Sequence, residues 1–280
     1  MPLPCPETPA LVHTSFYKFT PLPQPQVAAA MLRELVAEQA AGGLAGSILV
    51  AAEGINGMLA GSPAAVERFE QALQREPAFT AMAFKHSACV TRPFGKVRVQ
   101  VKKEIVPLGI EGVDAARATG IQVSPVDWGN LIKQPDVVLL DNRNSFEYRL
   151  GHFEGAIDPQ VTNFRDFPDF VRTHAAAWKA GGQRVAMYCT GGIRCEKTTA
   201  WMLDLGLVAY QLEGGILNYF QQVKDPGLAW KGECFVFDNR VALNASLQET
   251  ATTLEDVYQG EHDGPWRLQR ALRLAAAVAG

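Results

Sequence analysis

One short segment of the sequence combines the residue types that nucleophilic chemistry requires. It consists of Cys189, Thr190, Gly191, Gly192, Ile193 and Arg194. The two glycines let the backbone curl so that successive N–H groups point inward, while a following helix N-terminus and Arg194 add positive charge. Such a loop stabilises an anion, and that anion can be the thiolate of Cys189, the reactive form of cysteine. We predict that Cys189 and Arg194 are catalytic; the alternative is that Cys189 is a buried structural thiol on a tight turn.

Three residues outside the segment from Cys189 to Arg194 are candidates for binding substrate or assisting Cys189. Arg143 follows an apolar run that ends in Asp141, so it either anchors substrate or forms a structural pair with Asp141. Lys197 either contacts substrate or lies on an exposed helix face. Cys195 is close enough in sequence to serve as a resolving thiol, although packing in the first helical turn is the favoured interpretation.

A basic run precedes this region. Between Thr80 and Lys103 the sequence has six cationic side chains and no acidic one, namely Lys85, Arg92, Lys96, Arg98, Lys102 and Lys103. This run is the best candidate for binding phosphates, and Arg92, Lys96 and Arg98 are expected to contact nucleic acid. Phe94 either stacks on an unpaired base or packs in the core. The alternative for the whole run is a solvated strand face.

Composition excludes several classes of protein. A formal net charge of −3, from 26 basic and 29 acidic residues, rules out a polycationic coat, so a polyanion must bind a local patch. No apolar stretch reaches the roughly 18 residues of a membrane span, and the N-terminus does not resemble a signal peptide. Five cysteines and five scattered histidines lack disulfide-framework or metal-ligand spacing. We expect a cytoplasmic protein with no metal and no bound cofactor.

The first part of the chain predicts a ferredoxin-like domain over residues 13–112, after a flexible tail at 1–12. Hydrophobic spacing indicates strands at 15–20, 47–51, 58–60 and 97–101, and helices after Pro25 and Pro63. The order β-α-β-β-α-β is that of the ferredoxin-like fold.

After a linker at 113–124, residues 125–240 alternate between strands and helices, which indicates a parallel α/β sheet. Strands are expected at 137–140, 184–189 and 208–212, and helices at 167–180, 195–205 and 216–223. Residues 241–280 form a C-terminal extension with a short helix carrying Arg267, Arg270 and Arg273.

The second domain resembles a rhodanese domain. The resemblance rests on motifs in the family's order: Asp141-x-Arg143, Glu147-Tyr148, Gly151 to Ala156, the six-residue loop Cys189 to Arg194, and Glu213-Gly-Gly-Ile216. In that family the loop cysteine carries sulfane sulfur as a persulfide, whereas related phosphatases have a loop one residue longer.

One subfamily is more similar still, the oxygen-dependent tRNA uridine hydroxylases. The shared motifs are Ser15 to Phe19, Glu53 to Asn56, Lys96 to Arg98, Lys102 to Val106, Tyr188 to Lys197 and Phe235 to Asp238. The resemblance implies hydroxylation of the wobble uridine to 5-hydroxyuridine, with molecular oxygen as co-substrate and tRNA as partner. The chain has no cysteine after Cys234, whereas many members carry a cysteine-rich C-terminal segment. The alternatives are a sulfurtransferase carrying a persulfide on Cys189 and a non-catalytic RNA-binding module.

Overall fold

The computed structural model describes residues 11–276, which form two compact units. Of the described residues, the first unit contains 11–105, the short segment Asp238–Arg240 and 272–276. The second contains Val106–Phe237 and Val241–Ala271. The predicted tail at 1–12 lies mostly outside the described residues, but its last two positions belong to the first strand, which begins at Leu11.

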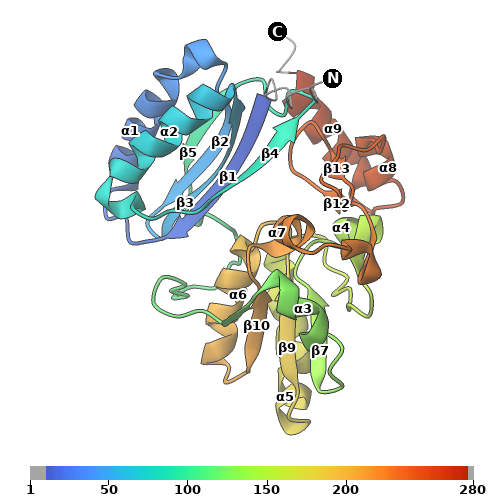
Figure 1. Ribbon diagram of the computed structural model, residues 1–280. Coiled ribbons are helices and arrows are strands. Elements are labelled where there is room, and N and C mark those ends of the chain that lie inside the picture. The colour runs from blue at the N-terminus through green and yellow to red at the C-terminus, as the bar shows by residue number, and fades with distance from the viewer. Residues whose placement is uncertain (1–10, 277–280) are drawn as a thin grey trace, which may run out of the picture. The chain divides into compact units, whose positions relative to one another are not determined.

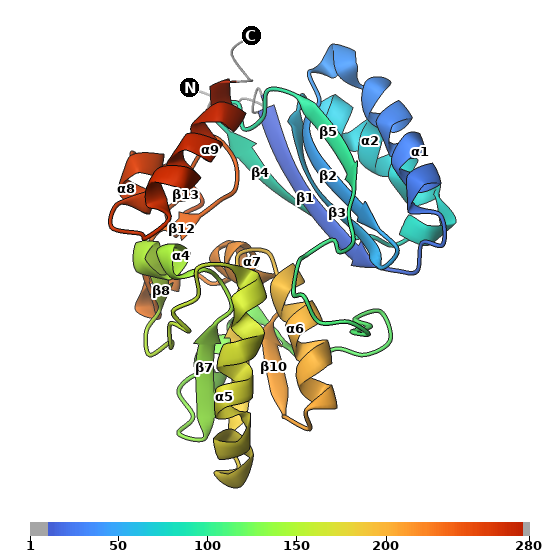
Figure 2. The same ribbon diagram turned by 180° about the vertical axis from the view of Figure 1, so that it is seen from behind.

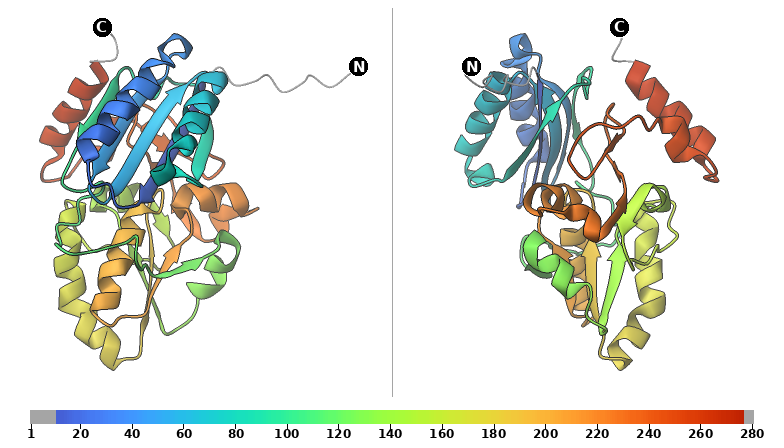
Figure 3. Two further views of the ribbon diagram at one scale, coloured as in Figure 1. Left: turned by 90° about the vertical axis from the view of Figure 1, so that its left-hand side faces the viewer. Right: turned by 45° about the vertical axis from the view of Figure 1, so that its right-hand side comes forward.

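The first unit is a five-stranded sheet with two helices on one face. In chain order its elements are β1 (Leu11–Phe19), α1 (Pro25–Ala37), β2 (Ala45–Ala51), β3 (Gly54–Gly61), α2 (Pro63–Arg75), β4 (Phe84–Cys89) and β5 (Val97–Val101). The strand order is β4-β1-β3-β2-β5. Both helices lie across the same face of this sheet, as the left view of Figure 3 shows. The ferredoxin-like fold is confirmed.

One strand occupies a different place from the one predicted. Val97–Val101 was expected to be the last strand of the β-α-β-β-α-β order, but that place belongs to β4, which pairs antiparallel with β1. The predicted strand instead forms β5, an addition at the opposite edge that runs parallel to β2. The alternation of Val97–Val101 therefore identified a strand correctly, while the polar composition of β4 concealed the other one.

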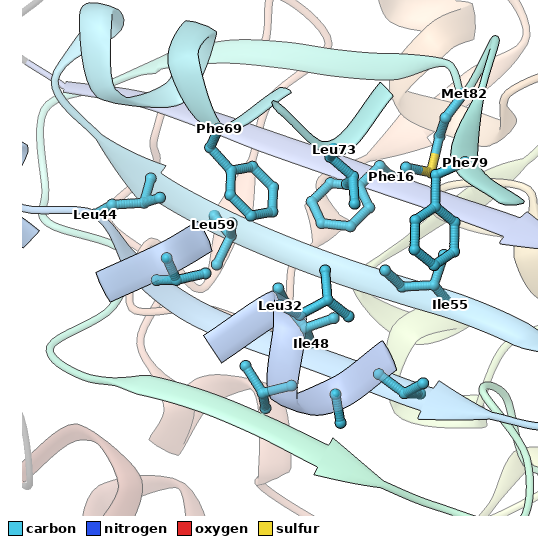
Figure 4. Close-up of a cluster of buried hydrophobic side chains, with 14 of the residues drawn as sticks. Phe16, Leu32, Leu44, Ile48, Ile55, Leu59, Phe69, Leu73, Phe79 and Met82 are labelled. Atoms are coloured by element: carbon cyan, nitrogen blue, oxygen red, sulfur yellow. The ribbon is translucent and has the colours of Figure 1, made fainter. Parts of the chain in front are cut away.

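The core of the first unit lies between the sheet and its two helices. Phe16 of β1 packs against Phe69 of α2, with ring centroids 5.8 Å apart, and Leu32 of α1 is fully buried in the same cluster. Figure 4 shows these side chains with Ile48 and Ile55 of the sheet. Alternate strand residues thus face the helices, and the intervening residues face the opposite side of the sheet.

The second unit is built on a four-stranded parallel sheet of order β6-β10-β9-β7. Helix α3 lies in front of this sheet in Figure 1 and α5 in front of it in Figure 2, so helices cover both faces. The elements are β6 (Ile121–Val123), α3 (Pro125–Leu131), β7 (Val137–Asp141), α4 (Ser145–Leu150), β8 (Gly151–Phe153), α5 (Phe167–Ala180), β9 (Arg184–Tyr188), α6 (Ile193–Asp204), β10 (Ala209–Leu212), α7 (Gly215–Gln222), β11 (Trp230–Gly232), β12 (Cys234–Phe235), β13 (Ala242–Leu243), α8 (Leu254–Tyr258) and α9 (Gly264–Ala276). The last residues of α9, from Leu272, belong to the first unit. The predicted α/β alternation is confirmed.

Within residues 11–276, no helix combines the length and apolar character needed to cross a bilayer. The predicted C-terminal helix corresponds to α9. Its Arg267 is not available as a free cation, because it pairs with Asp263 and donates to the carbonyl of Thr162.

Candidate active site

Cys189 lies directly after β9, where the strand gives way to a four-residue loop and then to α6. The backbone N–H of Gly192 donates to Cys189 Sγ over 3.1 Å. Gly192 has a φ of 99°, a conformation that side chains other than hydrogen rarely adopt, so glycine is required to aim this N–H at the sulfur. The loop therefore has the inward-pointing donor that the sequence predicts.

The surroundings of Cys189 favour the thiolate. Burial raises the pKa of Cys189, but this effect is outweighed by a hydrogen bond from the Cys195 thiol, the charge of Arg194 and backbone N–H donors from Cys195 and Gly192. The net result is a Cys189 pKa well below the usual value for cysteine. Cys195 shows the opposite shift: burial and the neighbouring sulfur raise its pKa, so it remains a thiol and a donor.

Cys195 is therefore more than a packing residue. It is fully buried, as the packing interpretation requires, but its thiol also contacts Cys189. The amide Nδ2 of Asn142 lies 3.8 Å from Cys195 Sγ and donates to Thr198 Oγ1 over 3.0 Å. Asn142 and Thr198 thus hold the face of α6 that carries Cys195.

Glu147 is a site residue that sequence reasoning did not assign. Its two carboxylate oxygens accept from both terminal nitrogens of Arg194, at 2.8 and 2.7 Å. Burial raises the pKa of Glu147, yet the guanidinium of Arg194 lowers it below the usual range, so the buried pair is ionised. The spacing Asn144-x-x-Glu147 is a capping box at the start of α4 and was the available sequence signal.

Helix α7 supports the loop that follows β9, which we call the reactive loop (Cys189–Gly192). The backbone N–H of Ile216 donates to the carbonyl of Cys189 over 3.0 Å, and that of Leu217 donates to the carbonyl of Thr190 over 3.2 Å. Gly215 makes this approach possible, because a Cβ there would lie 2.5 Å from the Cys189 carbonyl oxygen. The Glu213-Gly-Gly-Ile216 motif is thus part of the site's scaffold.

Arg143 is buried in the second unit, with 1% of its surface exposed. It makes a bidentate contact with Asp141, at 2.8 and 2.6 Å, and donates to the carbonyl of Gly151. Its guanidinium also lies over the rings of Tyr188 and Trp230. Of the two roles considered for Arg143, these contacts correspond to the structural pair.

Lys197 is likewise buried, with 1% of its surface exposed, and its Nζ donates to the carbonyl of Val106. It does not lie on an exposed helix face. Among the residues of the basic run, Lys96 and Arg92 are exposed, and Arg92 donates to the carbonyls of Phe94 and Gly43. Phe94 packs against the ring of His13, with centroids 5.8 Å apart.

In the part of the chain that the structure describes, no group of three or more His, Cys, Asp or Glu side chains is placed to hold a metal ion. The groups that the fold brings together at this site are the thiolate of Cys189, the thiol of Cys195 and the ion pair of Arg194 with Glu147.

Comparison with known families divides the chain as the fold does. Residues 11–105 match the UPF0176 acylphosphatase like domain, and residues 124–222 match the Rhodanese-like domain. The site described above lies in the rhodanese-like part, and the acylphosphatase-like part contains the sheet with α1 and α2.

Relatives over nearly the full chain define the family. The chain is 45% identical over 254 residues to the tRNA uridine(34) hydroxylase of Nitrobacter winogradskyi, which covers 89% of this chain and 98% of the relative. It is also 45% identical over 213 residues to the protein of the same name from Bartonella bacilliformis, covering 76% of this chain and 70% of the relative. The chain belongs to the tRNA uridine(34) hydroxylase family.

Similar solved structures cover about a third of this chain. They include a rhodanese-like domain protein from Staphylococcus aureus, with 20% identity, a TM-score of 0.29 and coverage of 35% of this chain and 90% of that one. An acylphosphatase from Coxiella burnetii matches with 13% identity and a TM-score of 0.25, covering 34% of this chain and 95% of that one.

Proposed function

We propose that this chain hydroxylates C5 of the wobble uridine of tRNA, with molecular oxygen as co-substrate and Cys189 as covalent catalyst. The observation that carries the proposal is the set of donors around Cys189 Sγ, which maintains a thiolate at the end of β9. The names of the relatives at 42–45% identity favour hydroxylation over sulfur transfer and over non-catalytic RNA binding.

The thiolate addresses the main chemical difficulty of the reaction. C5 of uracil is a poor nucleophile, but addition of a soft thiolate at C6 places enolate character on C5. Molecular oxygen, with two electrons from an external reductant and two protons, delivers one oxygen atom to C5 as a hydroxyl group and releases the other as water. Loss of the C5 proton with departure of the thiolate then restores the double bond. Cys189 is 1% exposed, so the side chains that cover it must move before a uracil reaches its sulfur.

The developing negative charge on O4 of the base requires a donor, as an oxyanion does. Arg143 is 1% exposed, and its guanidinium is held against Asp141 and the carbonyl of Gly151, so it is nearly inaccessible to a base. Arg194 lies in the first turn of α6, directly after the loop, is 8% exposed, and remains a cation because Glu147 raises its pKa despite burial. Each of its terminal nitrogens donates one N–H to Glu147 and keeps a second N–H. We assign O4 stabilisation to Arg194.

The remaining parts of the proposal concern how tRNA binds and where the reaction takes place. The backbone phosphates of tRNA are bound by cations of the first unit, and the candidates are the exposed Arg92 and Lys96 and the partly exposed Arg98. The wobble base leaves the anticodon stack to enter the rhodanese-like unit, which costs little in a single-stranded loop. The reaction takes place in the cytoplasm, where its substrate occurs.

The test compares tRNA nucleosides from cells with and without the gene, complemented by wild type or by Cys189→Ser. Product is expected with wild type alone, because a serine hydroxyl is far less ionised than a thiol at neutral pH. In vitro, an anticodon stem-loop carrying 5-fluorouridine at the wobble position should form an adduct on the Cys189 peptide. A thiosulfate-dependent gain of 32 Da on Cys189, without 5-hydroxyuridine, would instead identify a sulfurtransferase.

A further inference from the structure

The helix-free face of the first unit's sheet carries an ordered row of side chains. Strand pairing aligns one residue from each of the five strands, and the row reads Lys85, Ser15, Met58, Ser47 and Arg98 from β4 to β5. All five belong to the face opposite the helices, because their strand neighbours Phe16 and Ile48 lie in the core under α1 and α2. Helix α2 lies in front of the sheet in Figure 1 and behind it in Figure 2, so the helix-free face is the one turned towards the viewer in Figure 2.

The ends of this face are closed by segments of the same unit. At one end, Arg240 donates to Ser87 Oγ over 2.8 Å, and Asp238 approaches His13 at 3.7 Å. At the other end, Asn56 donates to the carbonyl of Ile105, which is itself buried. The row from Lys85 to Arg98 lies between these covered regions, and each of its five side chains is partly exposed.

The charge and length of the row suit a single-stranded nucleic acid. It has a cation at each end and small or flexible neutral side chains between them, across four strand spacings of about 4.8 Å, or roughly 19 Å. The next row, formed by Tyr17, Asn56, Leu49 and Gln100, is also free of acidic residues. Lys85 Nζ lies over the Tyr17 ring, 5.5 Å from its centre, so the cation covers one face of the ring and a base would stack on the other face.

Single-stranded nucleic acids bind to surfaces that combine cations for phosphates with aromatic rings for bases, and a sheet face of a βαββαβ unit can provide this. We propose that this face binds the single-stranded anticodon loop, with Arg98 and Lys85 on phosphates and Tyr17 stacked on a base. The proposal rests on the proposed function for the identity of the RNA, but it concerns binding and not the reaction.

The central experiment changes only charge in the middle of the row. Met58→Glu and Met58→Gln are nearly the same size, so a carboxylate facing phosphates is their main difference. The full-length protein is titrated with a fluorescent anticodon stem-loop, and folding of each variant is checked by its melting temperature. Met58→Glu is expected to bind at least tenfold more weakly than Met58→Gln.

A second set of variants tests the ends of the row and the aromatic ring. Arg98→Ala and Lys85→Ala should each lower the slope of log K against log salt by about 0.7. Lys179→Ala, at an exposed lysine near the C-terminal end of α5 in the other unit, is the matched control and should leave the slope unchanged. Tyr17→Ala should weaken binding about tenfold, whereas Tyr17→Phe retains the ring and should weaken it far less.

The outcomes separate this proposal from the proposed function. Equal affinity of Met58→Glu and Met58→Gln, with unchanged salt slopes for Arg98→Ala and Lys85→Ala, would overturn the sheet-face proposal while wild type still produces 5-hydroxyuridine. Wild-type protein that binds the stem-loop normally but forms no 5-hydroxyuridine would contradict the proposed function alone. Photocrosslinking of a 5-bromouridine stem-loop to peptides from β1 or β3 would support the sheet face directly.

Discussion

Arg194 and Glu147 form a buried bidentate ion pair in which both terminal nitrogens of the guanidinium are occupied by one carboxylate. The cation beside the reactive thiolate is therefore already partly neutralised by a residue from α4. This pairing fixes the position of Arg194 and also limits how strongly it attracts the charge on Cys189.

The first prediction concerns the loss of that carboxylate. Glu147→Gln leaves a buried guanidinium without its counter-ion, so the free energy of unfolding should fall by about 3 kcal/mol. Product formation should fall as well, because Arg194 and the loop lose their anchor. Urea denaturation measures the stability change. Glu154→Gln removes a carboxylate from an exposed pair with Lys231 and should change stability by less than about 0.5 kcal/mol; equal effects of both substitutions would contradict a special role for Glu147.

The second prediction concerns the hydrogen bond from Cys195 to Cys189. Cys195→Ala removes the donor and should raise the pKa of Cys189 by about one unit or more, because a hydrogen bond to a charged group contributes roughly 1.5–3 kcal/mol. Cys195→Ser retains an O–H donor and should keep the low pKa. The rate of iodoacetamide labelling of the Cys189 peptide against pH gives both values. Identical profiles for the Ala and Ser variants would show that the thiol contact does not matter.

The third prediction concerns Arg143, whose contacts are those of a structural residue. Arg143→Lys cannot reproduce the bidentate contact with Asp141 or the stacking on Tyr188 and Trp230, so it should destabilise the second unit by about 3 kcal/mol. At temperatures where the variant remains folded, its affinity for tRNA should match wild type. A variant of normal stability with weakened tRNA binding would instead assign Arg143 to substrate.

The fourth prediction concerns pH and His13, which is 4% exposed. Burial and the charge of Arg240 lower the pKa of His13 from 6.5 to about 4, although Asp238 acts in the opposite direction. Above pH 6.5 the ring is neutral in both folded and unfolded chains. As pH falls from 6.5 towards 4, only the unfolded chain takes up the proton, so stability is lost at about 1.4 kcal/mol per pH unit.

Replacing His13 with Gln removes this titration. The variant should be less stable than wild type at pH 7 because of altered packing, but it should lose less stability than wild type between pH 6.5 and pH 4.5. Urea unfolding of the first unit at several pH values provides the comparison, and parallel curves for the two proteins would rule out His13 as the source of acid sensitivity.

Local features of the site could be read from the sequence, because they depend on adjacent residues. The loop from Cys189 to Arg194 combines a strand end, two glycines and a helix start within one segment, and α5 was predicted over its observed range. Its charge environment could not be read in the same way. Glu147 and Arg194 are brought together by folding of separate βα units, and no local pattern shows that they form a pair.

The sequence was a poorer guide to whether a charged residue lies on the surface or in the interior. Lys197 sits in a helix that begins at the loop, which suggested exposure, but α6 is almost entirely buried along this stretch and Lys197 donates to Val106. Strand β4 was missed because its sequence, Phe84-Lys-His-Ser-Ala-Cys89, is typical of a half-exposed edge strand with few apolar residues. The burial of Lys197 reflects long-range packing that overrides local composition, whereas β4 lacks the apolar alternation that marks a strand.

The contact between Gly215 and the reactive loop has a consequence for how sequence change affects this protein. Adding a single methyl group at Gly215 is the smallest substitution available, yet it would collide with the Cys189 carbonyl and would force a φ of 73° on a residue with a side chain. Position 215 has no functional group of its own and lies well outside the motif that marks the nucleophile. A survey of natural variants that inspects only the loop would therefore overlook a position at which even alanine displaces the backbone of Cys189.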